Sequence, residues 1–440
     1  MAQTKIKIRD IWSFRRPERV LFAWSFLAIT AGYLMALMAK AGRPSPDWRE
    51  LMPLAVYLAA MAGMHVVLVL IRFRGDPLLL AAVFFLAGFG MLAQFRIGSF
   101  AVSTAEKLSS FAFPAGMALM LIVVLLFRNG RYRIFRPLAI PCALASAALL
   151  AAILVWGRYY RGAVFLPGNY NPSDLIKILL IIFLSGFLAR RRRDLEQTAG
   201  GLPAPPAHVL IPLFILWCIP MGLLVLQRDL GMLVLMNVVL IILLFAATGR
   251  ASYVVLGVLC AGALLAVMFR FSLHSQARFL VWLDPFQDPT GKSWQVLQSL
   301  SALYSGGLWG VGLGEGSPQC IPIASSDFIY AVIGEELGFA GCGIVLVFYL
   351  VLFYRGYHVA AGIRTPFGRL LATGIVTALA LQTLLNIGGV TKALPLTGIT
   401  LPFISHGGSS LVTTFLSAGL LLALSEKEPP VRGAKKKPQK

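Results

Sequence analysis

Charged residues are scarce in this sequence, and acidic residues are the scarcest of them. Asp, Glu, Lys and Arg make up 13% of the 440 residues, whereas 58% are hydrophobic and the mean hydropathy is +0.79. This composition excludes a soluble globular domain. It predicts an integral membrane protein whose whole length folds as one helical unit.

Cysteine is also rare, with five residues in the chain. One of them, Cys320, stands in a loop, and the other four stand inside apolar runs: Cys142, Cys218, Cys260 and Cys342. This placement excludes a disulfide framework and any spacing typical of a metal site. We expect the cysteines to be small core residues.

The formal net charge of +21 comes from short basic clusters between apolar runs, with no single basic patch. That distribution excludes nucleic acid as a partner and is typical of a protein oriented in a membrane. With the N-terminus placed in the cytoplasm, most Lys and Arg fall on that side, so both termini are expected there. The basic start leads into an apolar run without a small-residue cleavage site, so the first span should be its own insertion signal.

The apolar runs predict an all-α, polytopic membrane bundle of about 12 transmembrane helices, because a span needs about 20 apolar residues. The predicted spans are residues 20–38, 51–72, 77–95, 109–127, 137–156, 172–189, 208–226, 230–248, 252–270, 327–354, 366–389 and 405–424. One long connection, residues 271–326, is expected outside the cell, and long ordered connections tend to carry function. The Pro- and Lys-rich tail is expected to be disordered and to contact anionic lipid.

Residues 281–299, "VWLDPFQDPTGKSWQVLQS", contain a triplet that resembles the end of a nucleotide-binding loop. Gly291, Lys292 and Ser293 supply that end, but Phe286 stands where the first glycine is required. No strand precedes the triplet, and its expected place is outside the cell. The sequence therefore excludes a phosphate-binding loop here.

The same stretch holds a candidate catalytic carboxylate, Asp284. Its setting, "WLDPF", is apolar, which tends to raise the pKa of a carboxyl group and favours general acid or base chemistry. Arg278 would lower that pKa again. Capping of a short turn explains Asp284 equally well, and Asp288, in the second Asp-Pro pair, fits a turn residue better.

Asp174 and Lys177 lie three residues apart in "NPSDLIK", on one face of a predicted span. Ionisable groups inside spans are usually paired or functional. An ordinary helix start also explains the pattern, with Asn171 as N-cap and Pro172 at the first helical position. Both interpretations can hold together, with the pair lining a polar cavity.

Three more segments place polar residues in or beside the spans. They are a short outside turn with Gln227, Arg228 and Asp229, a span entrance with Asp327, Glu335 and Glu336, and a Gly- and Pro-rich stretch with Lys392, Ser405, His406, Ser409 and Ser410. The turn fits solvent exposure and substrate contact equally, whereas the two adjacent glutamates are expected to be buried or to face a cavity. The last stretch could form a re-entrant loop. A hydrolase is excluded, because neighbouring Ser and His do not form a nucleophile and base and no G-x-S-x-G elbow occurs.

Five blocks in one order carry a resemblance to a known family. They are "NPSDLIK", "QRDLG", "WLDPFQDPTGKSWQVLQSLSALYSGGLWGVGLGEG", "SSDFIYAVIGEELG" and "NIGGVTKALPLTGITLPFISHGGSS". Together they resemble the SEDS (shape, elongation, division and sporulation) family of bacterial membrane proteins, of the RodA/FtsW type, over residues 76–425. The blocks are shared by members that serve elongation, division and sporulation, so they assign none of these.

The resemblance implies a peptidoglycan glycosyltransferase that polymerises lipid II, a polyprenyl-linked precursor, at the outer face of the bacterial cytoplasmic membrane. It implies a transpeptidase partner of the class B penicillin-binding type, and it assigns the catalytic aspartate to Asp284. It leaves cofactors open, with a divalent cation such as Mg or Mn as one option. The residues then expected to bind substrate or line its cavity are Asp174, Lys177, Gln227, Arg228, Asp229, Arg278, Gln298, Asp327, Glu335, Lys392, Ser405, His406 and Ser409.

The resemblance also divides the chain into a basic N-terminal arm (1–19), two additional helices (20–75), a ten-helix core (76–425) and a basic tail (426–440). Two departures stand out: "IPIASSDF" lacks the acidic residue and histidine of the family's block, and His406 replaces a tyrosine. A transporter that flips lipid-linked precursors would use the same polar residues, and a non-catalytic scaffold is a third interpretation. The long outside loop with a carboxylate favours the enzyme.

Overall fold

The computed structural model describes residues 16–40, 48–98, 112–160, 163–165, 172–199, 202–203, 205–271 and 273–426. In this part the chain forms the predicted all-α bundle, accompanied by two very short antiparallel hairpins. Asn171, the predicted N-cap, lies outside the described residues.

The elements in chain order are α2 (Arg16–Lys40), η1 (Trp48–Leu51), α3 (Met52–Leu70), α4 (Pro77–Ile97), α6 (Ala112–Phe127), η2 (Arg131–Phe135), α7 (Ala139–Trp156), β1 (Arg158–Tyr160), β2 (Ala163–Phe165), α8 (Ser173–Arg190), α9 (Arg192–Leu195), β3 (Thr198–Ala199), β4 (Leu202–Pro203), α10 (Ala207–Leu226), α11 (Leu230–Thr248), α12 (Ala251–Phe271), α13 (Leu273–Leu283), α14 (Trp294–Gly306), η3 (Pro318–Cys320), α15 (Ile329–Gly362), α16 (Pro366–Val390) and α17 (Gly408–Ser425).

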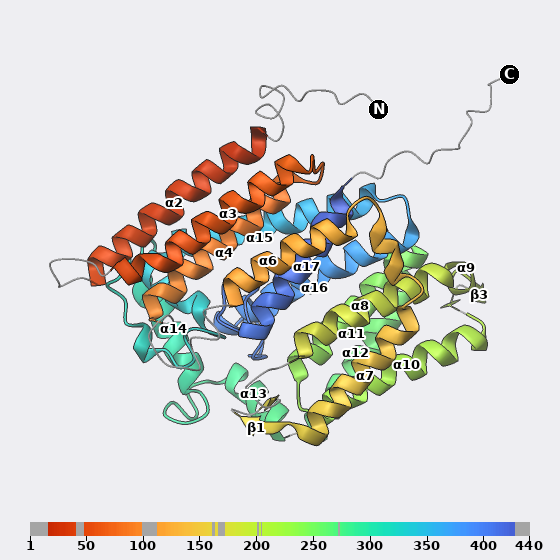
Figure 1. The fold of residues 1–440 in the computed structure, drawn as a ribbon. Coiled ribbons are helices and arrows are strands. Elements are labelled where there is room, and N and C mark those ends of the chain that lie inside the picture. Colours follow the sequence, from red (N-terminus) through yellow and green to blue (C-terminus); the bar gives the residue numbers. More distant parts are fainter. Residues whose placement is uncertain are drawn as a thin grey trace, which may run out of the picture.

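The long helices form two groups (Figure 1). One group contains α2, α3, α4, α6, α15 and α17, and the other contains α7, α8, α10, α11 and α12. Helix α16 joins them, because it packs against α15 and α17 on one side and against α8 and α11 on the other. The two groups therefore share one central helix.

Among the described residues, nine helices are long and apolar enough to cross a membrane, and they match nine of the predicted spans. The other three predictions correspond to α6, α8 and α12. Helix α6 and the apolar part of α12 are shorter in the described chain, and α8 carries Asp174, Lys177 and Arg190. The protein is a multi-pass membrane protein, and the count of twelve spans stays a prediction.

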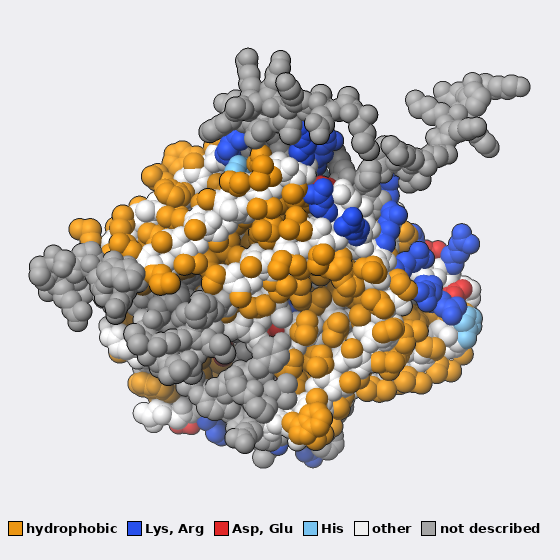
Figure 2. Space-filling model, viewed as in Figure 1, with side chains coloured by type: hydrophobic (Ala, Val, Ile, Leu, Met, Phe, Trp, Pro, Cys, Tyr) orange, Lys and Arg blue, Asp and Glu red, His pale blue; other side chains and the backbone are white. Residues whose placement is uncertain are grey.

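The surface matches this assignment. Figure 2 shows hydrophobic side chains as a broad belt over both groups of helices, with Lys and Arg gathered mainly along one edge. Exposed apolar side chains on the long helices include Phe214, Leu259 and Leu350. A belt of this kind fits the hydrocarbon core of a bilayer, and a basic edge fits a cytoplasmic face.

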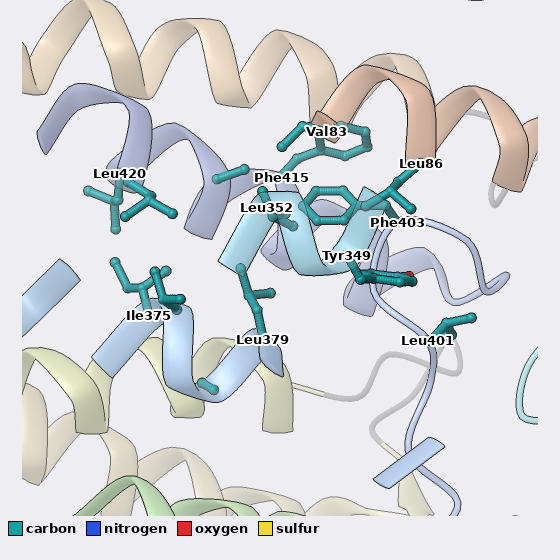
Figure 3. Packing of buried hydrophobic residues seen from close by; sticks show 14 of the residues in the cluster. Val83, Leu86, Tyr349, Leu352, Ile375, Leu379, Leu401, Phe403, Phe415 and Leu420 are labelled. Atoms are coloured by element: carbon teal, nitrogen blue, oxygen red, sulfur yellow. The ribbon is translucent and has the colours of Figure 1, made fainter. Parts of the chain in front are cut away.

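Helix α4 is the most deeply buried of the candidate spans, with 94% of its apolar window inside the protein. Asp76 caps its first turn by accepting hydrogen bonds from the amides of Leu78 and Leu79, both 3.0 Å. Figure 3 shows side chains from α4, α15, α16, α17 and residues 401–403 packed together: Val83, Leu86, Tyr349, Leu352, Ile375, Leu379, Phe415, Leu420, Leu401 and Phe403. This packing fixes α15 and α16, which carry or flank the polar residues described below.

The two additional helices, α2 and α3, cover one face of α4. The Tyr33 ring stacks on Phe95 with 4.2 Å between ring centroids, and its hydroxyl donates to the Glu50 carbonyl at 2.6 Å. His65 Nδ1 lies 2.6 Å from Glu18 Oε1 and links α3 to α2. These contacts join α2 to α4 and α3 to α2, so the pair is part of the bundle.

Helix α15 is broken at Gly338, which has φ 64° and ψ −165°. The glycine-rich stretch 306–316 closes the break: the amides of Phe339 and Ala340 donate to the carbonyls of Gly307 and Leu308 at 2.9 and 3.0 Å. The Val311 amide donates to the carbonyl of Glu335 at 2.9 Å. Backbone groups at membrane depth need such partners, so residues 307–312 are structurally required by the break.

Gly338→Ala is expected to lower the free energy of unfolding by about 1–3 kcal/mol, because a side chain there is strained at positive φ. An added Cβ would also lie 2.3 Å from the Gly310 nitrogen. Gly343→Ala is the matched control on the same helix, since nothing lies within 4 Å of its added Cβ. Thermal unfolding in detergent measures the difference, and equal melting temperatures for the two variants would contradict the strain.

Candidate active site

Polar side chains meet at the end of the bundle that carries the long connection. They come from the start of α8, the N-cap of α11, helix α13, the residues before α15, helix α16 and the segment 391–407. We call them the polar junction: Asp174, Lys177, Asp229, Arg278, Asp327, Gln382, Asn386 and Thr400.

Lys177 is the most deeply buried charge of the junction, with 2% of its surface exposed. Its Nζ donates to Asp174 Oδ1 at 3.0 Å, which confirms the predicted pair, and to Gln382 Oε1 at 2.6 Å. The Gln382 amide then donates to the Thr400 carbonyl at 3.1 Å, and the Thr400 hydroxyl lies 2.7 Å from Ser410 Oγ. The chain of contacts couples α8, α16 and α17.

Gln382→Leu is expected to cost about 1–3 kcal/mol of unfolding free energy, because the buried ammonium loses an acceptor. Thr383→Val is the control, since the buried Thr383 hydroxyl only donates within its own helix, to the Leu379 carbonyl at 2.9 Å. Thermal unfolding of both variants in one detergent measures the difference. A melting temperature of Gln382→Leu at or above that of Thr383→Val would contradict the role of the Lys177 contact.

Arg278 of α13 reaches the segment 391–407. Its Nη1 donates to the carbonyls of Thr397 at 2.7 Å and Leu396 at 3.3 Å. Trp282 makes a second link, since its indole donates to the Lys392 carbonyl at 3.0 Å. Helix α13 is therefore fixed against this segment through two of its side chains.

Two carboxylates flank Arg278 and influence its charge. Burial lowers the pKa of the Arg278 guanidinium, and the negative charges of Asp229 and Asp327 oppose that shift. Burial raises the pKa of both carboxyl groups, while Arg278 lowers it. Asp229 also caps α11 by accepting from the Met232 amide at 3.0 Å, and Asp327 Oδ1 accepts from Ser326 Oγ at 2.7 Å.

The segment 391–407 rests on the residues before α15. Ser405 Oγ donates to the Ser326 carbonyl at 2.5 Å, and the His406 amide donates to the Ser325 carbonyl at 2.7 Å. Ser405 is buried, whereas the side chains of His406 and Ser409 are half-buried. The predicted lining residue Ser405 thus mainly joins two segments.

Asp284 ends α13. Its amide donates to the Leu280 carbonyl at 2.9 Å, and its Oδ1 accepts from the Phe286 amide at 3.0 Å. The turn expected as one interpretation is therefore present. The described residues do not form the apolar setting expected from "WLDPF" around the carboxylate, because Asp284 is exposed and Leu283 and Phe286 have 56% and 72% of their surfaces exposed.

Glu335 and Glu336 lie with the glycine-rich stretch instead of the polar junction. Glu336 is buried, as predicted, and its Oε1 lies 2.7 Å from Arg96 Nε of α4. Glu335 Oε1 accepts from the Ser317 amide at 3.1 Å. Their contacts fasten the long connection to the bundle, beside an apolar cavity of about 20 Å³ next to Arg96.

Four other predicted residues occupy different surroundings. Gln227 is buried and donates to the Leu150 carbonyl at 2.8 Å, so it links α10 to α7. Arg228 is exposed and Lys392 is half-buried, and both have a positive φ of 60° in tight turns. Gln298 is half-buried on α14, a helix that packs against α15.

The sequence-based prediction missed Gln382, Asn386 and Thr400 of the polar junction, and also Gln94. The Asn386 amide donates to the carbonyls of Asp327 and Ile399 at 2.9 and 2.7 Å, and the three missed amide side chains are buried. A signal existed: Gln382 and Asn386 are four residues apart in an apolar run, which places two amides on one helical face.

The described residues contain no group of three or more His, Cys, Asp or Glu side chains placed to hold a metal ion. A bundle of apolar helices with the polar junction at one end defines a multi-pass membrane protein with a polar site. Residues 75–429 match the cell cycle protein family of FtsW, RodA and SpoVE. The chain belongs to this family, the SEDS family that the five sequence blocks resemble.

Curated relatives cover most of the chain. The peptidoglycan glycosyltransferase RodA of Mycobacterium tuberculosis strain H37Rv is 35% identical over 427 residues, which are 93% of this chain and 90% of the relative. The probable peptidoglycan glycosyltransferase FtsW of Geobacter sulfurreducens is 37% identical over 304 residues, which are 67% of this chain and 79% of that protein. The first of these alignments extends beyond the family match.

Solved structures share the fold. A chain from a study of the structural coordination of polymerization and crosslinking by a peptidoglycan synthase complex matches with a TM-score of 0.65 and 26% identity, covering 80% of this chain and 98% of that one. The rod shape determining protein RodA of Thermus thermophilus matches with a TM-score of 0.56 and 27% identity, covering 80% and 97%.

Proposed function

We propose that this membrane glycosyltransferase joins lipid II molecules into glycan strands at the outer face of the cytoplasmic membrane, with Asp284 as the general base. The observation that carries the proposal is the position of this carboxylate. It is exposed just after α13, a helix that Arg278 and Trp282 fix against the segment 391–407. Both termini then lie in the cytoplasm, in keeping with the basic edge in Figure 2.

The reaction needs one proton transfer and one displacement. The 4-hydroxyl of the acceptor sugar attacks the anomeric carbon of the donor chain, and Asp284 takes the hydroxyl proton. The bond from that carbon to the lipid diphosphate breaks, so the configuration inverts. Asp284 Oδ1 is occupied by the Phe286 amide, and Oδ2 makes no hydrogen bond with the described residues, so Oδ2 is the basic oxygen.

The charge on the departing diphosphate needs nearby cations. Lys177 is already paired with Asp174, and Arg278 lies between two carboxylates. The positive charge of each is therefore partly compensated by neighbouring carboxylates. Arg228 and Lys392 make no ion pair with the described residues. These two turn residues are therefore better suited to the diphosphate.

The partner proposed is a transpeptidase of the class B penicillin-binding type. The support is the structural match to a chain of a peptidoglycan synthase complex in which polymerization and crosslinking are coordinated. Polymerisation and crosslinking act on the same strand, so a crosslinking enzyme bound beside this protein would receive new glycan as it forms.

The test is polymerisation of purified lipid II by the purified chain in detergent, with and without a transpeptidase whose crosslinking serine is replaced. The proposal predicts glycan strands that a muramidase digests to disaccharides. Transport is irrelevant in detergent, so a flippase makes no glycan there. Unpolymerised lipid II in both reactions, with a correctly folded chain, would overturn the proposal.

A further inference from the structure

An open position lies over Gly398, between Arg278 and Asp327. A Cβ built on Gly398 would lie 3.5 Å from Arg278 Nη2 and 3.7 Å from Asp327 Oδ2. Gly398 is exposed, and its φ of 75° favours glycine. Arg278 and Asp327 form no ion pair within 4.0 Å in the described chain, so the two charged groups border this position without closing it.

One polar atom of each side chain is occupied. Arg278 Nη1 donates to the carbonyls of Leu396 and Thr397, and Asp327 Oδ1 accepts from Ser326 Oγ. Within the described residues, Arg278 Nη2 and Asp327 Oδ2 have no hydrogen-bond partner. The position over Gly398 therefore offers one donor and one acceptor side by side.

The local charge decides what can bind there. Arg278 carries one positive charge, and Asp229 and Asp327 both act on it. A diphosphate at Gly398 would face the Asp327 carboxylate, and like charges repel at such distances. A hydroxyl group fits instead, because it accepts from Nη2 and donates to Oδ2.

We infer that the position over Gly398 binds a neutral hydroxyl group of a saccharide and excludes the lipid diphosphate. The inference rests on the proposed function, since the saccharide is then that of lipid II. Arg278 lies on α13 and Asp284 is the first residue after this helix, six residues further along, or about 9 Å along the helix axis. A sugar held by Arg278 and Asp327 thus lies beside the helix that leads directly into the base, as an acceptor sugar must.

The test compares Asp327→Asn with wild type in the polymerisation assay, with inorganic diphosphate as an added inhibitor. A hydrogen bond to a charged group contributes more binding free energy than one to a neutral group. Replacing the Asp327 carboxylate by an amide should therefore raise the KM for lipid II about tenfold or more. The kcat should change little, because such binding is uniform between ground and transition states. A site for diphosphate predicts the opposite: loss of the negative charge would lower the KM and strengthen inhibition by diphosphate, and that result would overturn the inference.

Asp229→Asn is the charge-matched comparison, because Asn is as good an N-cap as Asp for α11. It removes the other negative charge beside Arg278 without touching the Gly398 position. Equal changes in KM for Asp327→Asn and Asp229→Asn would show a general effect of negative charge. That result would overturn a direct contact between Asp327 and the saccharide.

A binding measurement separates this inference from the proposed function. Calorimetry with a disaccharide that lacks lipid and diphosphate needs no turnover. The inference predicts binding to wild type that weakens about tenfold or more in Asp327→Asn, even if no glycan forms. Equal binding to both proteins, or none to wild type, would contradict it.

Discussion

Asp284→Asn is expected to lower the rate of glycan formation by about 10²–10⁴-fold, the contribution typical of a positioned general base. The amide cannot take the acceptor's proton, but its oxygen can still accept from the Phe286 amide, so the turn is kept. Initial rates of lipid II polymerisation at saturating substrate measure the effect. An unchanged melting temperature shows that the loss is chemical.

Asp288→Asn is the matched control in the same connection. Asp288 is exposed like Asp284, and its Oδ2 accepts from the Lys292 amide at 3.0 Å. Its variant is expected to keep the wild-type rate. A rate for Asp284→Asn equal to that of Asp288→Asn would remove Asp284 from the mechanism.

Glu336→Ala is expected to lower the free energy of unfolding by about 3–5 kcal/mol, because it leaves the Arg96 charge without its ion-pair partner. The pair lies 2.7 Å apart, with 3% of the glutamate side chain exposed. Arg96 also donates to the carbonyls of Gly314 and Gly316, so the glycine-rich stretch should loosen with it. Thermal unfolding in detergent measures the loss.

Glu196→Ala is the control for that experiment. Glu196 pairs with Arg192 at 2.8 Å, a similar separation, but both side chains are exposed. Exposed pairs contribute about 0–1 kcal/mol, so this variant should melt close to wild type. Similar melting temperatures for Glu336→Ala and Glu196→Ala would mean that the buried pair does not hold the connection.

The spans could be predicted from the sequence because the bilayer imposes a length on every apolar run. The ends were less accurate: the predicted span 327–354 is a helix that continues to Gly362. Its break at Gly338 was not predictable, since a glycine in an apolar run shows neither its φ nor the stretch that closes the gap.

The site was predictable where charge stood in an apolar run. Asp174 and Lys177 are paired as their spacing indicated. Gln382, the neutral third member, was missed because hydropathy gives an amide little weight, although its contacts couple three helices.

The surroundings of Asp284 were predicted wrongly. The apolar letters beside it in the sequence do not say which way their side chains point, and Leu283 and Phe286 point outward. Packing of α13 against residues 391–407, which lie more than a hundred positions away, decides that orientation.

The measurement that tests the central claim most directly uses proteoliposomes with lipid II in both leaflets and follows glycan and transbilayer movement in the same sample. The wild-type chain is expected to convert the lipid II of the leaflet matching the outer face into glycan without speeding the movement of lipid II between leaflets. Accelerated movement without glycan would contradict it and identify a transporter.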